Sequence, residues 1–315
     1  MDRKNFIKKG FVGTGMFAAT AALGNILKNE IEELAPLDFI GFNHIPNTDS
    51  NLRDNSVIHY STTRGKADHG WLLSHHTFSF ANYHNPERMH FGVLRVLNDD
   101  VVEGGKGFGT HPHDNMEIIS IPLDGDLEHK DNLGNVSVIK NGDIQVMSAG
   151  TGVMHSEFNY NEDRPVKFLQ IWIYPNRRNV APRYDQQSID QNSLKNRFQQ
   201  ILSPNHDDDG VWIHQDAWFH LGEFEAGVIS NYKIKKSGNG LYVFLIEGSA
   251  LVGNQNLNSR DGFGLWNISS IEIRSTSPST KILLMEVPMI LGQFIGWKIN
   301  FAKIQYNKQN KITNV

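Results

Sequence analysis

The feature that most restricts the fold is a succession of short apolar segments separated by tight-turn sequences. In the first half of the chain these segments are residues 91–98, 117–123, 127–131, 136–140, 143–148 and 166–174. The breaks between them include Asp124-Gly125 and Asn141-Gly142. Asn-Gly tolerates positive φ at both centres of a turn, which is typical of β-hairpins. Strands this short and this regularly spaced predict an all-β fold, built as an antiparallel sandwich or barrel.

A second set of strand-like segments follows a polar stretch at residues 182–202, which permits a helix. Its members are residues 211–215, 240–248, 249–253, 262–267, 270–275 and 281–287. In both halves a strand, a glycine turn and a further strand occur in that order, with Gly125 and Gly248 at the turns. We interpret this order as an internal duplication that gives two similar β-domains in tandem. Chance similarity between β-hairpins is the alternative.

The first residues have the layout of an export signal. Arg3 and Lys4 belong to a basic start, and an apolar stretch rich in Gly and Ala follows at residues 10–23. The segment resembles the twin-arginine signal, with Lys4 in place of the usual second arginine. We expect export to the periplasm by that route, with the membrane contacted only through the leader. A short packed helix, a retained anchor and a cytoplasmic location are the alternatives. The expected organisation is a leader and linker over residues 1–35, a first β-domain over 36–180, a second over 181–300 and a polar tail over 301–315.

Composition removes several functional classes. The chain contains no cysteine, which excludes disulfides, thiolate zinc sites and cysteine nucleophiles. The net charge is −4 with histidine neutral, and no long basic run occurs, so we expect no nucleic-acid partner. Any metal ion must therefore be bound by imidazole and oxygen ligands, for which the 14 histidines are candidates.

Two pairs of polar residues at strand spacing predict a metal site. His111 and His113 form the first pair, and His155 and Glu157 form the second. Residues i and i+2 of a strand point to the same face, so each pair projects together. The chain between the pairs, residues 114–154, holds about four strands, enough for the sheet to curl and bring one pair against the other. If both pairs face the barrel interior, three imidazoles and one carboxylate converge on one point.

Such a site would be open. Three nitrogens and an oxygen leave room in an octahedral shell for about two further ligands, whereas closed structural zinc sites more often use thiolates. Water, dioxygen or a chelating substrate could take those positions. Pro112 cannot donate to a ladder, so the first pair is expected at the edge or the start of a strand. The second half contains no H-x-H motif, and we expect no metal ligands there.

These residues resemble the cupin signature. The first cupin motif, G-x5-H-x-H-x3-E-x6-G, is matched by Gly105, His111, His113, Glu117 and Gly125, with one extra residue before the last glycine. The second, P-x-G-x2-H-x3-N, is matched by Gly152, His155 and Asn159, with Gly150 replacing the proline. More specifically, the chain resembles the pirin family, and within it the bacterial members described as quercetin 2,3-dioxygenases. The similar stretches are residues 68–83, 91–100, 104–119, 127–135, 147–159 and 168–175.

The resemblance implies a bicupin, that is, two tandem cupin barrels of the double-stranded β-helix or jelly-roll type, with one metal ion in the first. It implies that the ion is bound by His111, His113, His155 and Glu157. Glu117 would then be a structural acid, hydrogen-bonded to a ligand imidazole, rather than a ligand itself.

Three further histidines are open to other interpretations. His129 has no evident partner at strand spacing, so we interpret it as a surface or structural residue. His75 and His76 either line the mouth of the site or pack against the barrel.

The resemblance also implies an activity. It points to a metal-dependent dioxygenase that cleaves a flavonol or a similar enolic or phenolic substrate with O2. Glu157 would be the catalytic base that takes the proton of the substrate hydroxyl, and the imidazoles would hold the metal. Iron(II) is the favoured ion, with manganese, nickel, copper and zinc as alternatives. The expected partners are a small aromatic or enolic molecule and O2, and we expect a monomer. The alternatives are a non-enzymatic metal-binding protein with an interaction or redox-responsive role, and an enzyme acting on another substrate.

Overall fold

The computed structural model describes residues 55–290, which belong to one compact unit of the chain, His44–Val315. The regular structure of these residues is almost entirely β-strand, and their only helical elements are the short 3-10 turns η2 (Ser61–Thr63) and η3 (Gln191–Leu194). Within the described residues, no helix has the length and apolar character needed to cross a membrane. The expected export leader and the polar tail lie outside the described residues.

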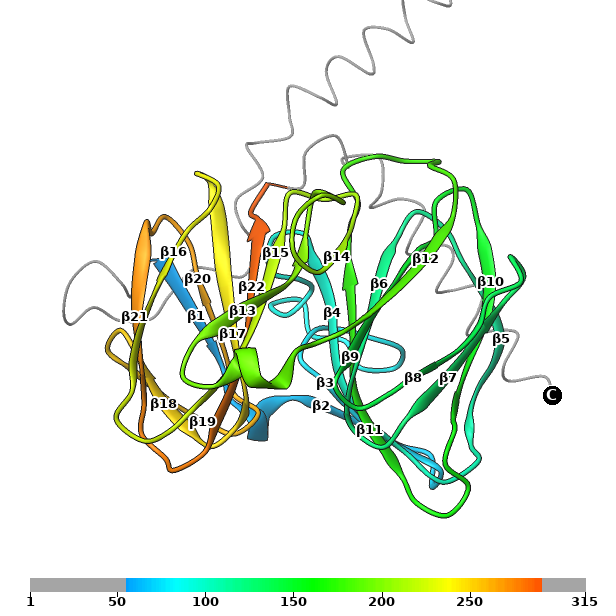
Figure 1. The fold of residues 1–315 in the computed structure, drawn as a ribbon, viewed down its shortest axis with the longest axis horizontal. Coiled ribbons are helices and arrows are strands. Elements are labelled where there is room, and N and C mark those ends of the chain that lie inside the picture. Colours follow the sequence, from blue (N-terminus) through cyan, green and yellow to red (C-terminus); the bar gives the residue numbers. More distant parts are fainter. Residues whose placement is uncertain (1–54, 291–315) are drawn as a thin grey trace, which may run out of the picture. The chain divides into compact units, whose positions relative to one another are not determined.

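The first domain consists of a seven-stranded and a four-stranded antiparallel sheet (Figure 1). The larger sheet has the order β12-β9-β6-β11-β4-β3-β2, and the smaller one has the order β5-β10-β7-β8. The strands are β2 (Gly65–Asp68), β3 (Leu72–His76), β4 (Leu94–Val102), β5 (Gly107–His113), β6 (Glu117–Asp124), β7 (Leu127–Asp131), β8 (Val136–Ile139), β9 (Asp143–Ser148), β10 (Val153–Asn159), β11 (Val166–Ile173) and β12 (Arg183–Ser188). Apolar side chains of both sheets, among them Leu127 and Phe168, pack together and close this barrel at one end.

The second domain repeats this plan. Its larger sheet has the order β1-β20-β17-β22-β15-β13-β14, and its smaller one has the order β16-β21-β18-β19. The strands are β1 (Ser56–His59), β13 (Phe198–Ser203), β14 (Val211–Trp212), β15 (Trp218–Phe224), β16 (Ile229–Lys233), β17 (Asn239–Glu247), β18 (Ser249–Val252), β19 (Gln255–Asn258), β20 (Gly262–Leu265), β21 (Ser270–Ser275) and β22 (Thr280–Pro288). Gly125 and Gly248 occupy the same turn in the two domains, both with positive φ. The expected all-β fold with two tandem barrels is confirmed.

The two domains exchange strands, which the sequence did not reveal. Strand β1 pairs with β20 of the second domain, and β12 pairs with β9 of the first. The expected boundary after residue 180 therefore separates β12 from the sheet to which it belongs. The stretch 182–202, interpreted as polar and helix-permissive, contains β12, η3 and most of β13. Its polar side chains find partners in the first domain, for example Gln186, which donates to Asp143 over 2.9 Å. These tertiary contacts outweigh the weak local preference of a polar segment.

The largest apolar core lies between the two seven-stranded sheets rather than inside either barrel. It joins side chains of the first domain, such as Ile119 and Leu169, to side chains of the second, such as Phe219, Phe244 and Met285. Since successive residues of a strand face opposite sides, the alternate residues of these strands line the barrel interiors. The two domains therefore share one core, and the site described below lies on the other face of the first sheet.

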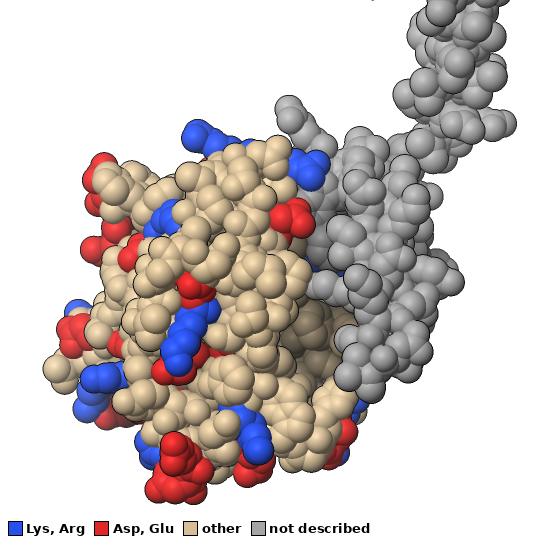
Figure 2. All heavy atoms as spheres, turned by 90° about the vertical axis from the view of Figure 1, so that its right-hand side faces the viewer, with Lys and Arg blue, Asp and Glu red and all other residues tan. Residues whose placement is uncertain are grey.

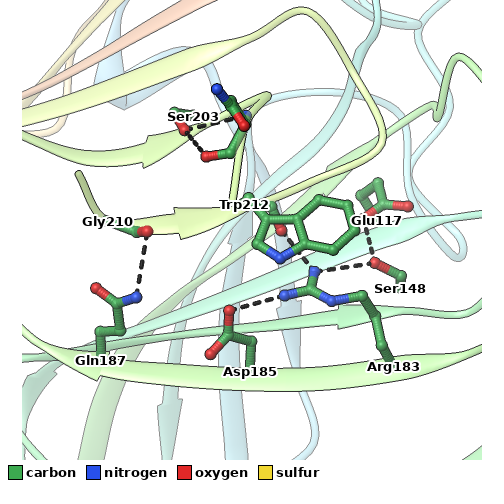
Figure 3. A network of polar contacts seen from close by, with 9 residues as sticks. Glu117, Ser148, Arg183, Asp185, Gln187, Ser203, Gly210 and Trp212 are labelled. Atoms are coloured by element: carbon green, nitrogen blue, oxygen red, sulfur yellow. Dashed lines mark hydrogen bonds and ion pairs between the residues drawn. The ribbon is translucent and has the colours of Figure 1, made fainter. Parts of the chain in front are cut away.

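A polar network around Arg183 also joins the domains (Figure 3). The Arg183 guanidinium donates to the main-chain oxygen of Trp212 over 2.6 Å and to Asp185 over 2.7 Å. Its central carbon lies 3.9 Å from the centre of the Trp212 ring, which is a cation–π contact. Gln187 donates to the main-chain oxygen of Gly210 over 3.2 Å. Strand β12 is thus hydrogen-bonded to both domains.

Candidate metal centre

Three of the predicted metal ligands meet in the first barrel. Strands β5 and β10 are antiparallel neighbours, and their register places His155 directly opposite His111. The ring centres are 4.4 Å apart for His111 and His155, 4.8 Å for His111 and His113, and 4.9 Å for His113 and His155. One nitrogen from each ring lies within 4.8 Å of the other two. The three imidazoles of the two strand-spaced pairs therefore lie together in the structure.

The local backbone explains how these strands reach this geometry. Strand β5 is the edge strand of its sheet, as Pro112 required. The β5–β10 register shifts between His155 and Glu157, which marks a β-bulge or irregularity beside the imidazole group. Just before β10, Gly150 has a φ of +47°, and a Cβ at this position would lie 2.1 Å from the main-chain oxygen of Val180. Only glycine fits there, so the chain enters β10 along one path.

The fourth predicted ligand, Glu157, lies outside the imidazole group. Its side chain is 2% exposed and faces the larger sheet. Ser120 of β6 donates to Glu157 Oε1 over 3.0 Å, and Gln170 of β11 donates to Oε2 over 2.7 Å. Glu157 is two residues from His155 along β10, so the two side chains lie on the same face of that strand.

A row of polar side chains crosses the larger sheet beneath Glu157. Its members, each the register partner of the next across six strands, are Gln186, Gln145, Ser120, Gln170, Asn98 and His76. All except Gln186 are buried. In the second domain the corresponding row is Ile58, Phe263, Val243, Leu284, His220 and Gln200. Four of these six are apolar and pack in the core of the second barrel. The first barrel thus has a polar interior where the second is filled with apolar side chains.

The state of His155 suits a metal ligand. Burial first, and then the neighbouring His111 and His129, lower its pKa to about 3. The ring is therefore neutral at physiological pH, which is the metal-binding form of histidine. Neither ring nitrogen has a hydrogen-bond partner among the described residues, although the side chain is buried. An unsatisfied buried polar group is costly, and a metal ion bound to one nitrogen would remove part of that cost. The donor set present here fits a divalent ion.

His129 is not a surface residue, so that alternative was wrong. It is fully buried on β7, and its Nε2 lies 3.2 Å from Asp131 Oδ2. Burial alone would raise the pKa of Asp131, but hydrogen bonds from Asn135, His129 and Leu133 outweigh burial and lower it. The signal was present in the sequence, because Asp131 follows His129 at the same i, i+2 spacing as the two predicted pairs.

Glu117 lies outside the imidazole group and faces away from the barrel interior. It lies three residues before Ser120 on β6, so the two side chains point to opposite faces of the strand. Glu117 accepts a hydrogen bond from Ser148 over 2.6 Å, within the network of Figure 3. Burial raises the pKa of Glu117 to about 7. The sequence allowed this carboxylate to share a face with His113, but the two residues belong to different strands, β6 and β5.

The aromatic segment near His76 reaches the site through one tryptophan. Phe80 and Trp172 pack edge to face with ring centres 5.4 Å apart, and Trp172 packs likewise against His113 at 5.0 Å. His76 is buried and its Nδ1 lies 2.8 Å from Asn98 Oδ1, so it belongs to the polar row.

The face of the molecule turned toward the viewer in Figure 2 carries charges of both signs, interspersed rather than gathered in one patch.

Comparisons with known proteins agree with this architecture. The sequence profile described as Pirin matches residues 57–173, and the profile described as Quercetinase C-terminal cupin domain matches residues 200–287. A curated relative, quercetin 2,3-dioxygenase from Escherichia coli (strain K12), is 39% identical over 227 residues, which is 72% of this chain and 96% of the relative. A pirin-like protein from Caulobacter vibrioides is 38% identical over 221 residues, which is 70% of this chain and 94% of the relative.

Solved structures give the same result. The crystal structure of YhhW from Escherichia coli has a TM-score of 0.71 and 37% identity, and the match covers 75% of this chain and 98% of that one. The structure of bacterial pirin YhhW in complex with nickel(II) has a TM-score of 0.70 and 36% identity, with coverage of 75% and 100%. Both barrels thus match one known architecture, and one of the matched structures holds a metal ion.

Proposed function

The chain belongs to the pirin family, and from this premise we propose that it is a metal-dependent dioxygenase that cleaves a flavonol or a similar enolic or phenolic substrate with O2. The observation that carries the proposal is the meeting of three imidazoles beside a buried carboxylate in the polar barrel. Relatives named quercetin 2,3-dioxygenase support the reaction class.

We assign the binding of one divalent ion to His111, His113 and His155, with Glu157 beside them. When bound, such an ion raises the acidity of a hydroxyl that it contacts and holds that hydroxyl beside dioxygen. Iron(II) is our first choice, because an open site of nitrogen and oxygen ligands is typical of iron oxygenases. The YhhW complex holds nickel(II), so nickel is the second ion to test.

Glu157 has the position of a catalytic base. Its carboxylate is buried, and its two oxygens are held by Ser120 and Gln170. A carboxylate held in this way is ready to accept the proton of a substrate hydroxyl that reaches the imidazole cluster. Ser120 and Gln170 keep the carboxylate in place, and the apolar core between the sheets keeps bulk water away from its far side.

The proposal is tested with protein purified without added metal. Elemental analysis should find one transition-metal ion per chain. Oxygen uptake with a panel of flavonols and catechols should then show consumption of a flavonol, with equimolar release of carbon monoxide. Bound metal without turnover of any member of the panel would contradict the dioxygenase and favour a non-enzymatic metal-binding protein.

Removal of one imidazole should remove the metal. His155→Ala deletes a buried ligand at the centre of the cluster, so we expect the affinity for the ion to fall by at least about 100-fold, together with any oxygenase rate. His206→Ala is the control, because His206 is 67% exposed on the second domain. Metal content measured on both variants decides the assignment, and a His155→Ala protein with full metal occupancy would show it to be wrong.

A further inference from the structure

We propose that Asp131 and His129 form a buried carboxylate–imidazole pair that positions His155 for metal binding and supplies negative charge to the metal centre. The inference rests on the metal centre proposed above. It adds two positioning residues from β7, a strand that carries none of the predicted ligands.

The sheet register places this pair beside the cluster. Strand β10 lies between β5 and β7 in the smaller sheet. His155 is opposite His111 on one side and Asp131 on the other. Glu157, the next residue on that face of β10, is opposite His129. The pair therefore lies on the same face of the sheet as the proposed ligands, in the neighbouring strand.

Asp131 is held rigidly. The main-chain N–H groups of Leu133 and Asn135 donate to its Oδ1 over 2.9 and 3.0 Å, and the Asn135 side chain donates to Oδ2 over 2.7 Å. Three such donors favour the ionised carboxylate. The remaining contact, 3.2 Å to His129 Nε2, is then satisfied by an N–H on that nitrogen. This places the lone pair of the His129 ring on Nδ1.

The Nδ1 of His129 is available to His155. It is buried and has no hydrogen-bond partner among residues 55–290. The ring centres of His129 and His155 are 5.3 Å apart, and the Tyr184 ring, 4.7 Å from His129 by the same measure, packs against it. An imidazole bound to a metal through one nitrogen carries a proton on the other, and such protons usually go to a carboxylate or another acceptor. The His129 lone pair is an acceptor of this kind, and Asp131 fixes the tautomer that provides it.

Charge gives a second role to Asp131. Three neutral imidazoles bring no charge to the barrel interior, where an uncompensated divalent ion would be strongly disfavoured. Glu157 supplies one negative charge, and Asp131, a carboxylate held by three hydrogen-bond donors, lies directly opposite His155. Together the two carboxylates balance a divalent ion.

The test measures cobalt(II) binding to the full chain, by competition with a chromogenic chelator and by the visible spectrum of the bound ion. Asp131→Asn keeps the shape of the side chain and removes its charge, and His129→Phe keeps a ring and removes both nitrogens. The control is Asp143→Asn, because Asp143 is also a buried carboxylate of the first domain. It accepts from the main chain of Lys140, from Gln186 and from Ser188 over 2.6–2.9 Å.

We expect Asp131→Asn and His129→Phe to weaken cobalt(II) binding by about 10- to 100-fold and to alter the visible spectrum. Asp143→Asn should bind as the unmodified chain does, even though the metal-free forms of all three variants melt at lower temperature. Binding by both Asp131→Asn and His129→Phe within about twofold of the unmodified chain would overturn the inference, as would an equal loss in Asp143→Asn.

The same titration separates this inference from the proposed function. Absence of binding to the unmodified chain, or undiminished binding to His155→Ala, would contradict the metal centre itself. Should Asp131→Asn fail to fold, His129→Phe and His129→Gln carry the comparison, since both leave the turn held by Asp131 intact.

Discussion

Gln170 and Leu284 occupy the same place in the two domains. Each lies at the centre of its larger sheet, Gln170 opposite Ser120 and Leu284 opposite Val243. The backbone there is the same, but only the polar pair holds a carboxylate, since Gln170 donates to Glu157. Replacing Gln170 by leucine would therefore give the first barrel the apolar side chain that the second barrel has at this position.

We expect Gln170→Leu to fold and to lose activity. The second barrel shows that leucine fits this position in a sheet of the same plan. The variant leaves Glu157 with one donor fewer, and a hydrogen bond to a charged group contributes about 1.5–3 kcal/mol, so the oxygenase rate should fall by roughly 10- to 100-fold. Steady-state kinetics on the best flavonol checks this result. An unchanged kcat would show that Gln170 does not hold the base.

Glu117 should make stability depend on pH. Burial raises its pKa to about 7 in the folded chain, from 4.5 for an ordinary glutamate. Between these two values the unfolded chain has released the proton and the folded chain still binds it. The folded state is thus disfavoured as the pH rises through this window.

Glu117→Gln removes this effect. One pKa unit corresponds to ~1.4 kcal/mol. As the pH rises from about 4.5 to 7.5, the free energy of unfolding of the variant should therefore increase by about 3 kcal/mol relative to that of the unmodified chain. Urea unfolding of the metal-free proteins at several pH values measures the difference. A constant difference across this range would contradict the raised pKa.

At the scale of elements, the entry to β10 places the imidazole cluster. The loop before this strand runs past Val180, whose main-chain oxygen accepts a hydrogen bond from Thr151 N over 3.0 Å. Gly150 lies against the same carbonyl oxygen and has positive φ. The position of His155 relative to β5 therefore depends on a close backbone approach that a side chain at residue 150 would prevent.

Gly150→Ala should disturb both stability and metal binding. The added methyl group would lie 2.1 Å from the Val180 oxygen, so the backbone must move. Gly134→Ala is a matched control, because Gly134 also has positive φ, at +97°, but a Cβ there meets nothing within 4 Å. Strain alone costs about 1 kcal/mol, so we expect that loss for Gly134→Ala and a larger one for Gly150→Ala. Thermal melts and metal content measured on both variants test this prediction. An equal loss of stability and of metal in Gly150→Ala and Gly134→Ala would contradict the role of the close approach to Val180.

Elements that depend on local pattern could be predicted from the sequence, and those that depend on distant partners could not. Strands β7, β9 and β21 begin and end at the expected residues, because alternation and turn glycines act within a few residues. The His111/His113 and His155/Glu157 pairs could be identified for the same reason, because they too depend on strand spacing. Strands β1 and β12 were missed. Strand β1 pairs with β20, and β12 pairs with β9 across two intervening strands, and neither short segment carries a local signal for its partner. His129 was left open between a surface and a structural position, because the strands β10 and β12 that pack against it lie beside β7 only after folding.

At the scale of the whole molecule, the exchanged strands and the shared core make the two domains interdependent. The apolar core between the larger sheets draws on both, and β12 is hydrogen-bonded to both. Neither barrel corresponds to one continuous segment of the chain. Strand β1 precedes the strands of the first domain in the sequence but is part of the larger sheet of the second. The second barrel, with its apolar interior, packs against the sheet whose other face carries the polar row.

The chain should consequently unfold in one step, and damage to the second domain should destabilise the first. Phe244 of β17 is fully buried in the shared core, with the Arg64 guanidinium 5.9 Å from its ring centre. Phe244→Ala should lower the free energy of unfolding by about 3–5 kcal/mol. Because the core is shared, amide protons of β6 and β9 should lose protection together with those of β17 and β22. Hydrogen exchange followed by mass spectrometry, at increasing urea, resolves these strands separately. Retention of full protection in β6 and β9 after β17 and β22 have exchanged would show that the first barrel folds without its neighbour.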